Sequence, residues 1–268
     1  EGYTVQVDGE DFFVRGMNWG YVPIGTNYSY DLWSKSDVFI ETVLHREMKQ
    51  LKAMGVNAIR LFNVVPPRWV TWIRDKYGIY TAVNHLMGRY GFEVNGSFVP
   101  NIDYNNPAHR KAILDDLKST IERFKDVRGV LLYMLGNENN YGLHWTSFEI
   151  EALPGKEYDA RAEHLYSLMG EAATLVKGID AKRPTMLTNG DLQYLELIAK
   201  HCRDVDIMGS NVYRGPSMGD LYERVGKTLK RPVIFSEFGA DAYNAKEGRE
   251  DHRMQAEMLQ AQWAEMYL

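Results

Sequence analysis

The sequence predicts an α/β chain in which parallel strands alternate with helices around a barrel. With 268 residues, the chain is long enough for one large domain of this type. Short apolar runs typical of buried parallel strands recur about every 35 residues, and a helical pattern follows each run. The Gly-rich first turn of a doubly wound open sheet is absent, and so is a P-loop. We therefore expect a (β/α)8 TIM barrel.

An N-terminal hairpin is the first element that the sequence predicts. Residues 3–7 alternate between apolar and polar side chains, and residues 12–14 form a second short apolar run. Asp8-Gly9 lies between them, a pair that suits a tight hairpin turn. We expect this hairpin to close the N-terminal end of the barrel.

Seven strand–helix units follow the hairpin. The expected strands are residues 14–18, 58–62, 79–83, 130–135, 185–188, 207–212 and 233–238. The expected helices are residues 40–54, 67–76, 107–125, 159–177, 192–201, 218–229 and 250–266. Asn106 stands where a helix cap is expected, directly before Pro107 at the first helical position. Gly55, Gly78 and Gly178 follow helical runs, where a left-handed C-terminal cap is expected.

An eighth strand is not evident. The chain ends at Leu268, directly after the seventh helical pattern. Three alternatives are open: the barrel lacks an eighth strand, a poorly marked segment of the chain forms it, or it has been removed by truncation at the C-terminal end. A barrel without it would leave two sheet edges unpaired, which disfavours solubility.

Composition excludes several classes of function. Asp and Glu total 36 against 31 Lys and Arg, for a net charge of −5, so the chain has no general attraction to nucleic acid. Cys202 is the single cysteine, which rules out an intrachain disulfide, and no Cys/His spacing resembles a zinc site. No apolar run reaches the roughly 18 residues that a membrane span needs. We expect neither a metal nor a cofactor.

Two predicted strands end in a carboxylate. Asn137-Glu138 follows the fourth strand, and Glu237 lies at the end of the seventh. Active sites of barrels of this type are built at the C-terminal ends of the strands. A carboxylate next to a buried strand is costly unless it has a partner or a function. Two at matching positions make a paired-carboxylate site for acid–base chemistry plausible.

These residues resemble those of the clan A retaining glycoside hydrolases. Residues 13–18 and 55–60 are similar to the catalytic barrel of family 2, which includes β-galactosidase and β-glucuronidase relatives, and family 5 and the β-1,3-glucanosyltransferases look similar there. The resemblance spans roughly residues 12–239. It implies that residues 1–268 form a single catalytic barrel domain that cleaves O-glycosidic bonds of a carbohydrate with retention. The chain departs from the family in its eighth strand, which usually offers a tryptophan.

The resemblance also implies a role for each residue of the pair and for its neighbours. Glu138 would be the acid/base and Glu237 the nucleophile. Arg60 and the Tyr213 hydroxyl would hold Glu237 ionised, while the charge of Glu237 would keep Glu138 protonated. Asn137 would hydrogen-bond the 2-hydroxyl of the sugar. The ordinary alternative is that both glutamates are loop residues paired with nearby Arg or Lys.

Other polar and aromatic residues near the predicted strand ends are candidates for contact with the sugar. They are Asn18, Trp19, Asn84, His85, Trp145, Asn189, Asp191 and Asn211. His85 suits a structural hydrogen bond as well as a ligand contact, and Trp145 suits core packing as well as sugar stacking.

Three other functions stay open beside hydrolysis. A β-glucan transglycosylase would use the same two carboxylates, and a non-catalytic carbohydrate-binding barrel would keep the fold without the chemistry. A metal-dependent isomerase or hydrolase would need several ligands, and only His85 and Asp191 are available besides the glutamates. The sugar, the linkage and the oligomeric state are not determined by the sequence.

Overall fold

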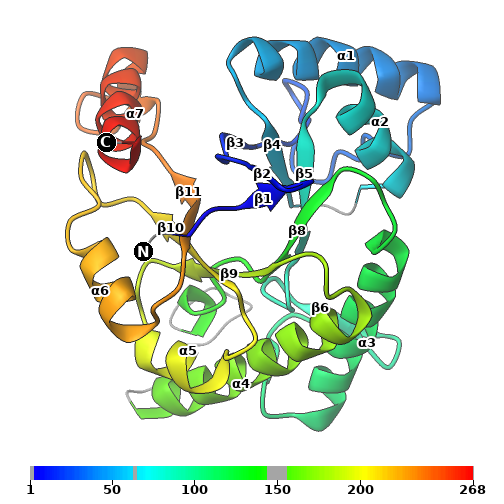
Figure 1. Cartoon of the computed structure of the whole chain (residues 1–268), viewed down its shortest axis with the longest axis vertical. Coiled ribbons are helices and arrows are strands. Elements are labelled where there is room, and N and C mark those ends of the chain that lie inside the picture. The colour runs from blue at the N-terminus through cyan, green and yellow to red at the C-terminus, as the bar shows by residue number, and fades with distance from the viewer. Residues whose placement is uncertain (1–2, 63–64, 144–155, 268) are drawn as a thin grey trace.

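Seven parallel strands form one sheet in the computed structural model of the chain, which describes residues 3–62, 65–143 and 156–267 (Figure 1). They lie in the order β11-β10-β9-β8-β5-β4-β3, and every pairing between neighbours is parallel. The strands are β3 (Gly16–Asn18), β4 (Ala58–Leu61), β5 (Tyr80–His85), β8 (Val130–Leu135), β9 (Thr185–Gly190), β10 (Ile207–Val212) and β11 (Val233–Phe238). The sheet curves into a nearly closed barrel, and the predicted fold class is confirmed.

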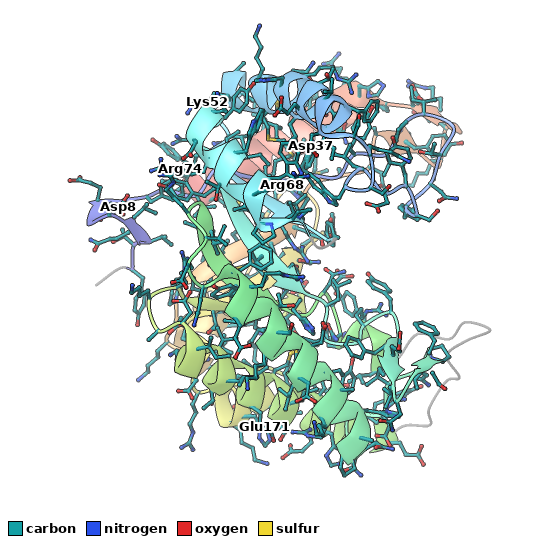
Figure 2. The ribbon with its side chains drawn as sticks, turned by 90° about the vertical axis from the view of Figure 1, so that its right-hand side faces the viewer. Asp8, Asp37, Lys52, Arg68, Arg74 and Glu171 are labelled. Carbon is teal, nitrogen blue, oxygen red and sulfur yellow. The ribbon has the colours of Figure 1, made fainter. Side chains whose placement is uncertain are left out.

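Each of these strands leads into a helix. The helices are α1 (Asp37–Ala53), α2 (Pro67–Tyr77), α3 (Pro107–Phe124), α4 (Lys156–Ile179), α5 (Leu195–His201), α6 (Leu221–Thr228) and α7 (His252–Tyr267). A short 3-10 helix, Tyr141–Leu143, follows β8. The Asn106 side chain caps α3 ahead of Pro107, as predicted. Helices α1 and α2 are joined on their outer surface by an ion pair between Asp37 and Arg68 (Figure 2).

Some predicted boundaries were wrong. Asn84 and His85 are the last residues of β5 and do not follow it, and β9 continues as far as Gly190. Gly55 and Gly78 have the left-handed backbone expected after a helix, with φ of 86° and 66°. Gly178 does not, because α4 continues through Ile179, whose side chain packs against the core.

The N-terminal hairpin is confirmed, with shorter arms than predicted. It consists of β1 (Gln6–Val7) and β2 (Glu10–Asp11), which are antiparallel. Asp8 and Gly9 form the turn with φ of 53° and 84°, the positive values that a tight hairpin needs. Figure 2 shows Asp8 at the tip of the hairpin, away from the helices. Two further hairpins lie in loops: β6 (Phe92–Val94) with β7 (Ser97–Val99), and β12 (Tyr243–Asn244) with β13 (Arg249–Glu250).

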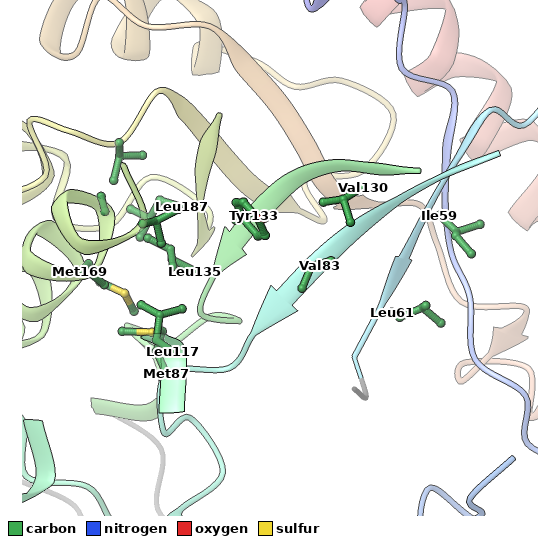
Figure 3. Packing of buried hydrophobic residues seen from close by; sticks show 14 of the residues in the cluster. Ile59, Leu61, Val83, Met87, Leu117, Val130, Tyr133, Leu135, Met169 and Leu187 are labelled. Atoms are coloured by element: carbon green, nitrogen blue, oxygen red, sulfur yellow. The ribbon is translucent and has the colours of Figure 1, made fainter. Parts of the chain in front are cut away.

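The core has two layers because successive side chains of a strand point to opposite faces of the sheet. In the outer layer, Leu135 of β8 lies near Leu117 of α3 and Met169 of α4 (Figure 3). The inner layer consists of Ala58, Ala82, Leu131, Leu132, Met134, Met186 and Ile207. The alternation is interrupted at Leu131, where the register between β5 and β8 shifts. Hairpin and flanking residues Val5, Val7, Phe12 and Val14 pack against this inner layer. The hairpin therefore covers the barrel interior, as expected.

The sheet ends at β3 on one side and β11 on the other, and no eighth strand lies between them in the described residues. The Asn18 side chain spans part of this gap, since its Nδ2 donates to the Ser236 carbonyl oxygen at 3.0 Å. Helix α7 packs beside it through Trp263, which stacks on Phe238 and meets Phe13 edge-on. Most residues of β11 are only partly buried, whereas those of β10 are fully buried.

Candidate active site

The C-terminal ends of four strands bring the main predicted residues together. Arg60 lies on β4, Asn137 directly follows Gly136 at the end of β8, Asn211 lies on β10 and Glu237 on β11. Parallel strands of a barrel all end at the same mouth, so these side chains from distant parts of the sequence converge there.

Arg60 is the centre of the resulting network. Its side chain is only 5% exposed, and it donates at 2.8 Å to three side-chain oxygens. Nη1 donates to Oε1 of Glu237, Nη2 to Oδ1 of Asn137, and Nε to Oδ1 of Asn84. Burial lowers the pKa of Arg60, and the Glu237 carboxylate opposes that shift. A single guanidinium thus sets the positions of Glu237 and Asn137 relative to each other.

Glu237 is held through both carboxylate oxygens. Arg60 Nη1 donates a hydrogen bond to Oε1, and the Tyr213 hydroxyl donates one to Oε2 at 2.9 Å. Burial, followed by the charge of Glu237, raises the pKa of Tyr213 well above its ordinary value, so this phenol keeps its proton and donates it. The Glu237 side chain is 16% exposed, which leaves part of the carboxylate accessible.

Asn137 and Asn211 extend the network across the mouth. Asn211 Nδ2 lies 3.5 Å from Asn137 Oδ1, and Asn211 Oδ1 accepts from the Ser236 hydroxyl at 2.6 Å. Asn137 Nδ2 donates to the Tyr90 hydroxyl at 2.9 Å. Asn137, Asn211 and Ser236 are all buried, so the bonds among them are shielded from water.

Glu138 differs from Glu237 in its electrostatic surroundings. Burial raises the pKa of the Glu138 carboxyl, and the charge of Glu237 raises it further. A hydrogen bond with Asn211 and the charges of Arg89 and Arg60 lower it, without reversing the shift. The expectation that the charge of Glu237 keeps Glu138 protonated was therefore incomplete, since burial is the larger cause.

The structure also shows site residues that the sequence did not single out. Tyr90 contacts Asn137, and Ser236 contacts Asn211. Asn84 was one of many strand-end candidates, and it proves to bind both Arg60 and the Gly136 carbonyl. Tyr90 lies in a loop with no periodic pattern, so no signal in the sequence marks it. Ser236 directly precedes Glu237, and its position next to a strand-end carboxylate was the only available signal.

Several predicted contact residues are not part of this network. Trp19 is 6% exposed, and it packs in the core next to Trp33. His85 Nε2 lies 3.0 Å from Asp116 of α3, and its Nδ1 accepts from the Met87 backbone N–H, which occupies both ring nitrogens.

Asn18 and Trp145 are two further predicted contacts. Asn18 reaches the Ser236 carbonyl at the gap between the sheet edges, and Arg60 Nη1 lies 3.5 Å from the same oxygen. Trp145 falls outside the described residues.

Two general properties of the described residues bear on function. They contain no group of three or more His, Cys, Asp or Glu side chains arranged to hold a metal ion. None of the helices in the described ranges has the length and apolar character to cross a membrane.

Comparison with known proteins gives matches over most of the chain. The model of the family described as glycosyl hydrolases family 2, TIM barrel domain, matches residues 25–268. The β-galactosidase of Arthrobacter sp. (strain B7) is 29% identical over 140 residues, covering 52% of this chain and 13% of that protein. The β-galactosidase of Clostridium acetobutylicum is 32% identical over 101 residues, covering 36% of this chain and 11% of that protein. The match thus spans about an eighth of the length of these relatives.

Solved structures support the same fold. The family 2 β-galacturonidase from Eisenbergiella tayi, bound to galacturonate, matches with a TM-score of 0.66 and 14% identity, over 100% of this chain and 43% of that one. A calcium-binding mutant of Bacteroides uniformis β-glucuronidase 2 matches with a TM-score of 0.61 and 17% identity, over 97% of this chain and 29% of that one. The family expected from the strand-end motifs is confirmed. The chain belongs to glycosyl hydrolase family 2 and carries the TIM barrel domain of that family.

Proposed function

We propose that residues 1–268 form one catalytic domain, a retaining β-glycosidase in which Glu237 is the nucleophile and Glu138 the acid/base. The observation that carries this proposal is the Arg60 network. It links Glu237 on β11 to Asn137, the residue before Glu138, through one buried guanidinium. A retaining mechanism needs one ionised and one protonated carboxyl group on facing sides of the sugar. The unlike surroundings of Glu138 and Glu237 support this division of roles.

The reaction proceeds in two displacements. The Glu237 carboxylate attacks the anomeric carbon while Glu138 donates its proton to the leaving oxygen, so the glycosidic bond breaks as a glycosyl ester forms. Water then attacks the anomeric carbon of the ester, Glu138 accepts a proton from it, and the Glu237 carboxylate leaves. The raised pKa of Glu138 suits a group that must begin the cycle protonated.

The surrounding residues position these groups and bind sugar. Arg60 and Tyr213 orient the two oxygens of Glu237 and stabilise its negative charge. Asn137 has one amide hydrogen beyond the bond to Tyr90, and we assign that hydrogen to a hydroxyl of the sugar, the 2-hydroxyl by resemblance.

The sugar class is proposed from the relatives. The curated relatives are β-galactosidases, and the solved structures include a β-galacturonidase and a β-glucuronidase. We propose a β-linked hexose or hexuronic acid as the substrate, with β-galactosides as the first to test.

The test is a screen of aryl β-galactosides, β-glucuronides and β-galacturonides, with the anomeric configuration of the first product followed by NMR. Glu237→Gln is expected to abolish turnover of every substrate, since each one needs the nucleophile. Glu138→Ala is expected to keep activity on 2,4-dinitrophenyl glycosides, whose leaving group needs no proton. Azide should rescue Glu138→Ala and yield a β-glycosyl azide.

Glu223→Gln, at an exposed glutamate of α6, is the matched control and should keep wild-type activity. An inverted first product would contradict the retaining mechanism. Equal losses on activated and unactivated substrates in Glu138→Ala would contradict its role as the acid. Products with an added sugar would show transfer to a sugar acceptor in place of water.

A further inference from the structure

Glu138 has an uncommon backbone conformation. Its φ is 52°, in the left-handed region that glycine favours and that a residue with a long side chain rarely adopts. Such a conformation persists only where the surrounding structure fixes it, and these positions gather at functional sites. Because φ and ψ set the direction of the Cα–Cβ bond, the conformation also determines where the Glu138 carboxyl points.

Hydrogen bonds hold the Glu138 peptide groups on both sides. The backbone N–H of Glu138 donates to the Thr188 carbonyl of β9 at 3.0 Å. The Glu138 carbonyl accepts from the Tyr141 N–H at 2.9 Å and from Arg89 Nε at 3.1 Å. These bonds fix the loop to β9 and to the segment after β5.

The Asn139 side chain also binds the backbone of Asn137, the residue before Glu138 in the same loop. Its Oδ1 accepts from the backbone N–H of Asn137 at 2.8 Å, so the side chain folds back over the Glu138 backbone. Its Nδ2 lies within 3.0–3.2 Å of three acceptors, which are the carbonyls of Leu86 and Met87 and the Tyr104 hydroxyl.

The space for the Asn139 amide depends on a glycine. Gly136 has φ of 85°, and a Cβ atom there would lie 2.6 Å from Asn139 Oδ1. Asn139 itself is only 3% exposed. The amide therefore fills a closely fitted site between the end of β8 and the loop after β5, and it contacts the backbone on the N-terminal side of Glu138.

We propose that Asn139 is a positioning residue that holds Glu138 in its left-handed conformation and so aims the acid at the leaving oxygen. This inference rests on the proposed function of Glu138. Asn139 does not touch the reacting atoms. It acts through the Asn137–Glu138 backbone, and a shift of about 1 Å in a catalytic group can cost about a hundredfold in rate.

The neighbouring Asn140 is a matched control. It is the same residue type, it is 1% exposed, and its amide also makes several hydrogen bonds. These bonds go to Gly190 at the end of β9 and to Gln193 after it, and none goes to the Asn137–Glu138 backbone. Loss of Asn140 therefore removes a comparable buried amide without removing the contact that holds Glu138.

The experiment compares Asn139→Leu with Asn140→Leu on 2,4-dinitrophenyl and phenyl β-galactoside, with Glu138→Ala as the reference. In Asn139→Leu, we expect kcat/KM on the phenyl substrate to fall at least about tenfold more than on the dinitrophenyl substrate, since only the former needs the acid. Asn140→Leu should lower both by the same factor. Asn139→Ser replaces Asn139→Leu if the leucine variant does not fold.

A crystal structure of each variant supplies a readout without activity. Glu138 should leave the left-handed region in Asn139→Leu and keep it in Asn140→Leu. An unchanged Glu138 backbone in Asn139→Leu, or equal losses on the two substrates, would overturn the positioning role. An absence of leaving-group dependence in Glu138→Ala would instead overturn the proposed acid, whatever the Asn139 variants do.

Discussion

Replacing Arg60 by methionine should damage both the stability and the activity of this domain. Methionine keeps most of the length of the side chain and removes the guanidinium. Glu237, Asn137 and Asn84 then each lose a donor that lies 2.8 Å away in the structure. Arg60 is 5% exposed and the Glu237 side chain 16%, so water replaces little of what is lost.

The expected loss of stability follows from this burial. Breaking a buried ion pair by removing one partner costs about 3–5 kcal/mol, because the remaining charge is left uncompensated. With a urea m-value of about 3 kcal/mol/M, the unfolding midpoint should fall by about 1 M or more. The kcat/KM of the folded variant should be about a hundredfold lower, since Glu237 and Asn137 lose the hydrogen-bond donor that they share.

Urea unfolding at neutral pH and turnover of an aryl β-glycoside measure the two effects. Arg183→Met is the control, because Arg183 forms a 2.6 Å ion pair with the buried Asp180 and bonds the Val130 carbonyl at the start of β8, away from the mouth. It should lose stability and keep kcat/KM. The double variant Arg60→Met/Glu237→Leu should be more stable than the sum of the single losses implies, by about 1–3 kcal/mol. Additive losses, or an Arg60→Met midpoint equal to wild type, would refute the reasoning.

Three further predictions concern other parts of the domain. Because burial raises the pKa of Glu138, kcat/KM on phenyl glycosides should fall as pH rises through that pKa. The protonated form stabilises the fold below the unfolded pKa of about 4.3, and this contribution is lost as pH rises through the folded value. The urea midpoint of Glu138→Gln should therefore rise relative to that of wild type as the pH increases above about 4. Tyr90→Phe removes the hydroxyl that accepts from Asn137 and should lower kcat/KM about three- to tenfold, while Tyr28→Phe, at a tyrosine 93% exposed, should change nothing. Trp263→Ala removes the ring contacts with Phe238 and Phe13, so amide hydrogen exchange should accelerate in α7 and stay unchanged in β8.

The order of strands and helices was predictable because it depends on local pattern. A parallel strand that is buried on both faces is a continuous apolar run, and a helix that packs one face against the sheet has apolar residues at helical spacing. Both patterns can therefore be recognised from residues that are close together in the sequence. The positions of Glu138 and Glu237 at strand ends were predictable for a related reason. A carboxylate at the end of an apolar run stands out because burying it is costly. The continuation of α4 past Gly178 was not predictable, since it depends on the packing of Ile179 against the core.

The composition of the site was decided only by the tertiary structure. Arg60 and Glu237 are 177 positions apart, and the bond between them exists because the two strands end at the same mouth. His85 resembled a ligand until the fold placed Asp116 of α3 against its ring. Tyr90 and Asn139 lie in loops without periodic pattern, and their contacts with Asn137 arise from neighbouring strand ends. The sequence by itself determined which residues are costly to bury. The partners of those residues were decided by the tertiary structure, because closing the barrel brings distant segments within hydrogen-bonding distance.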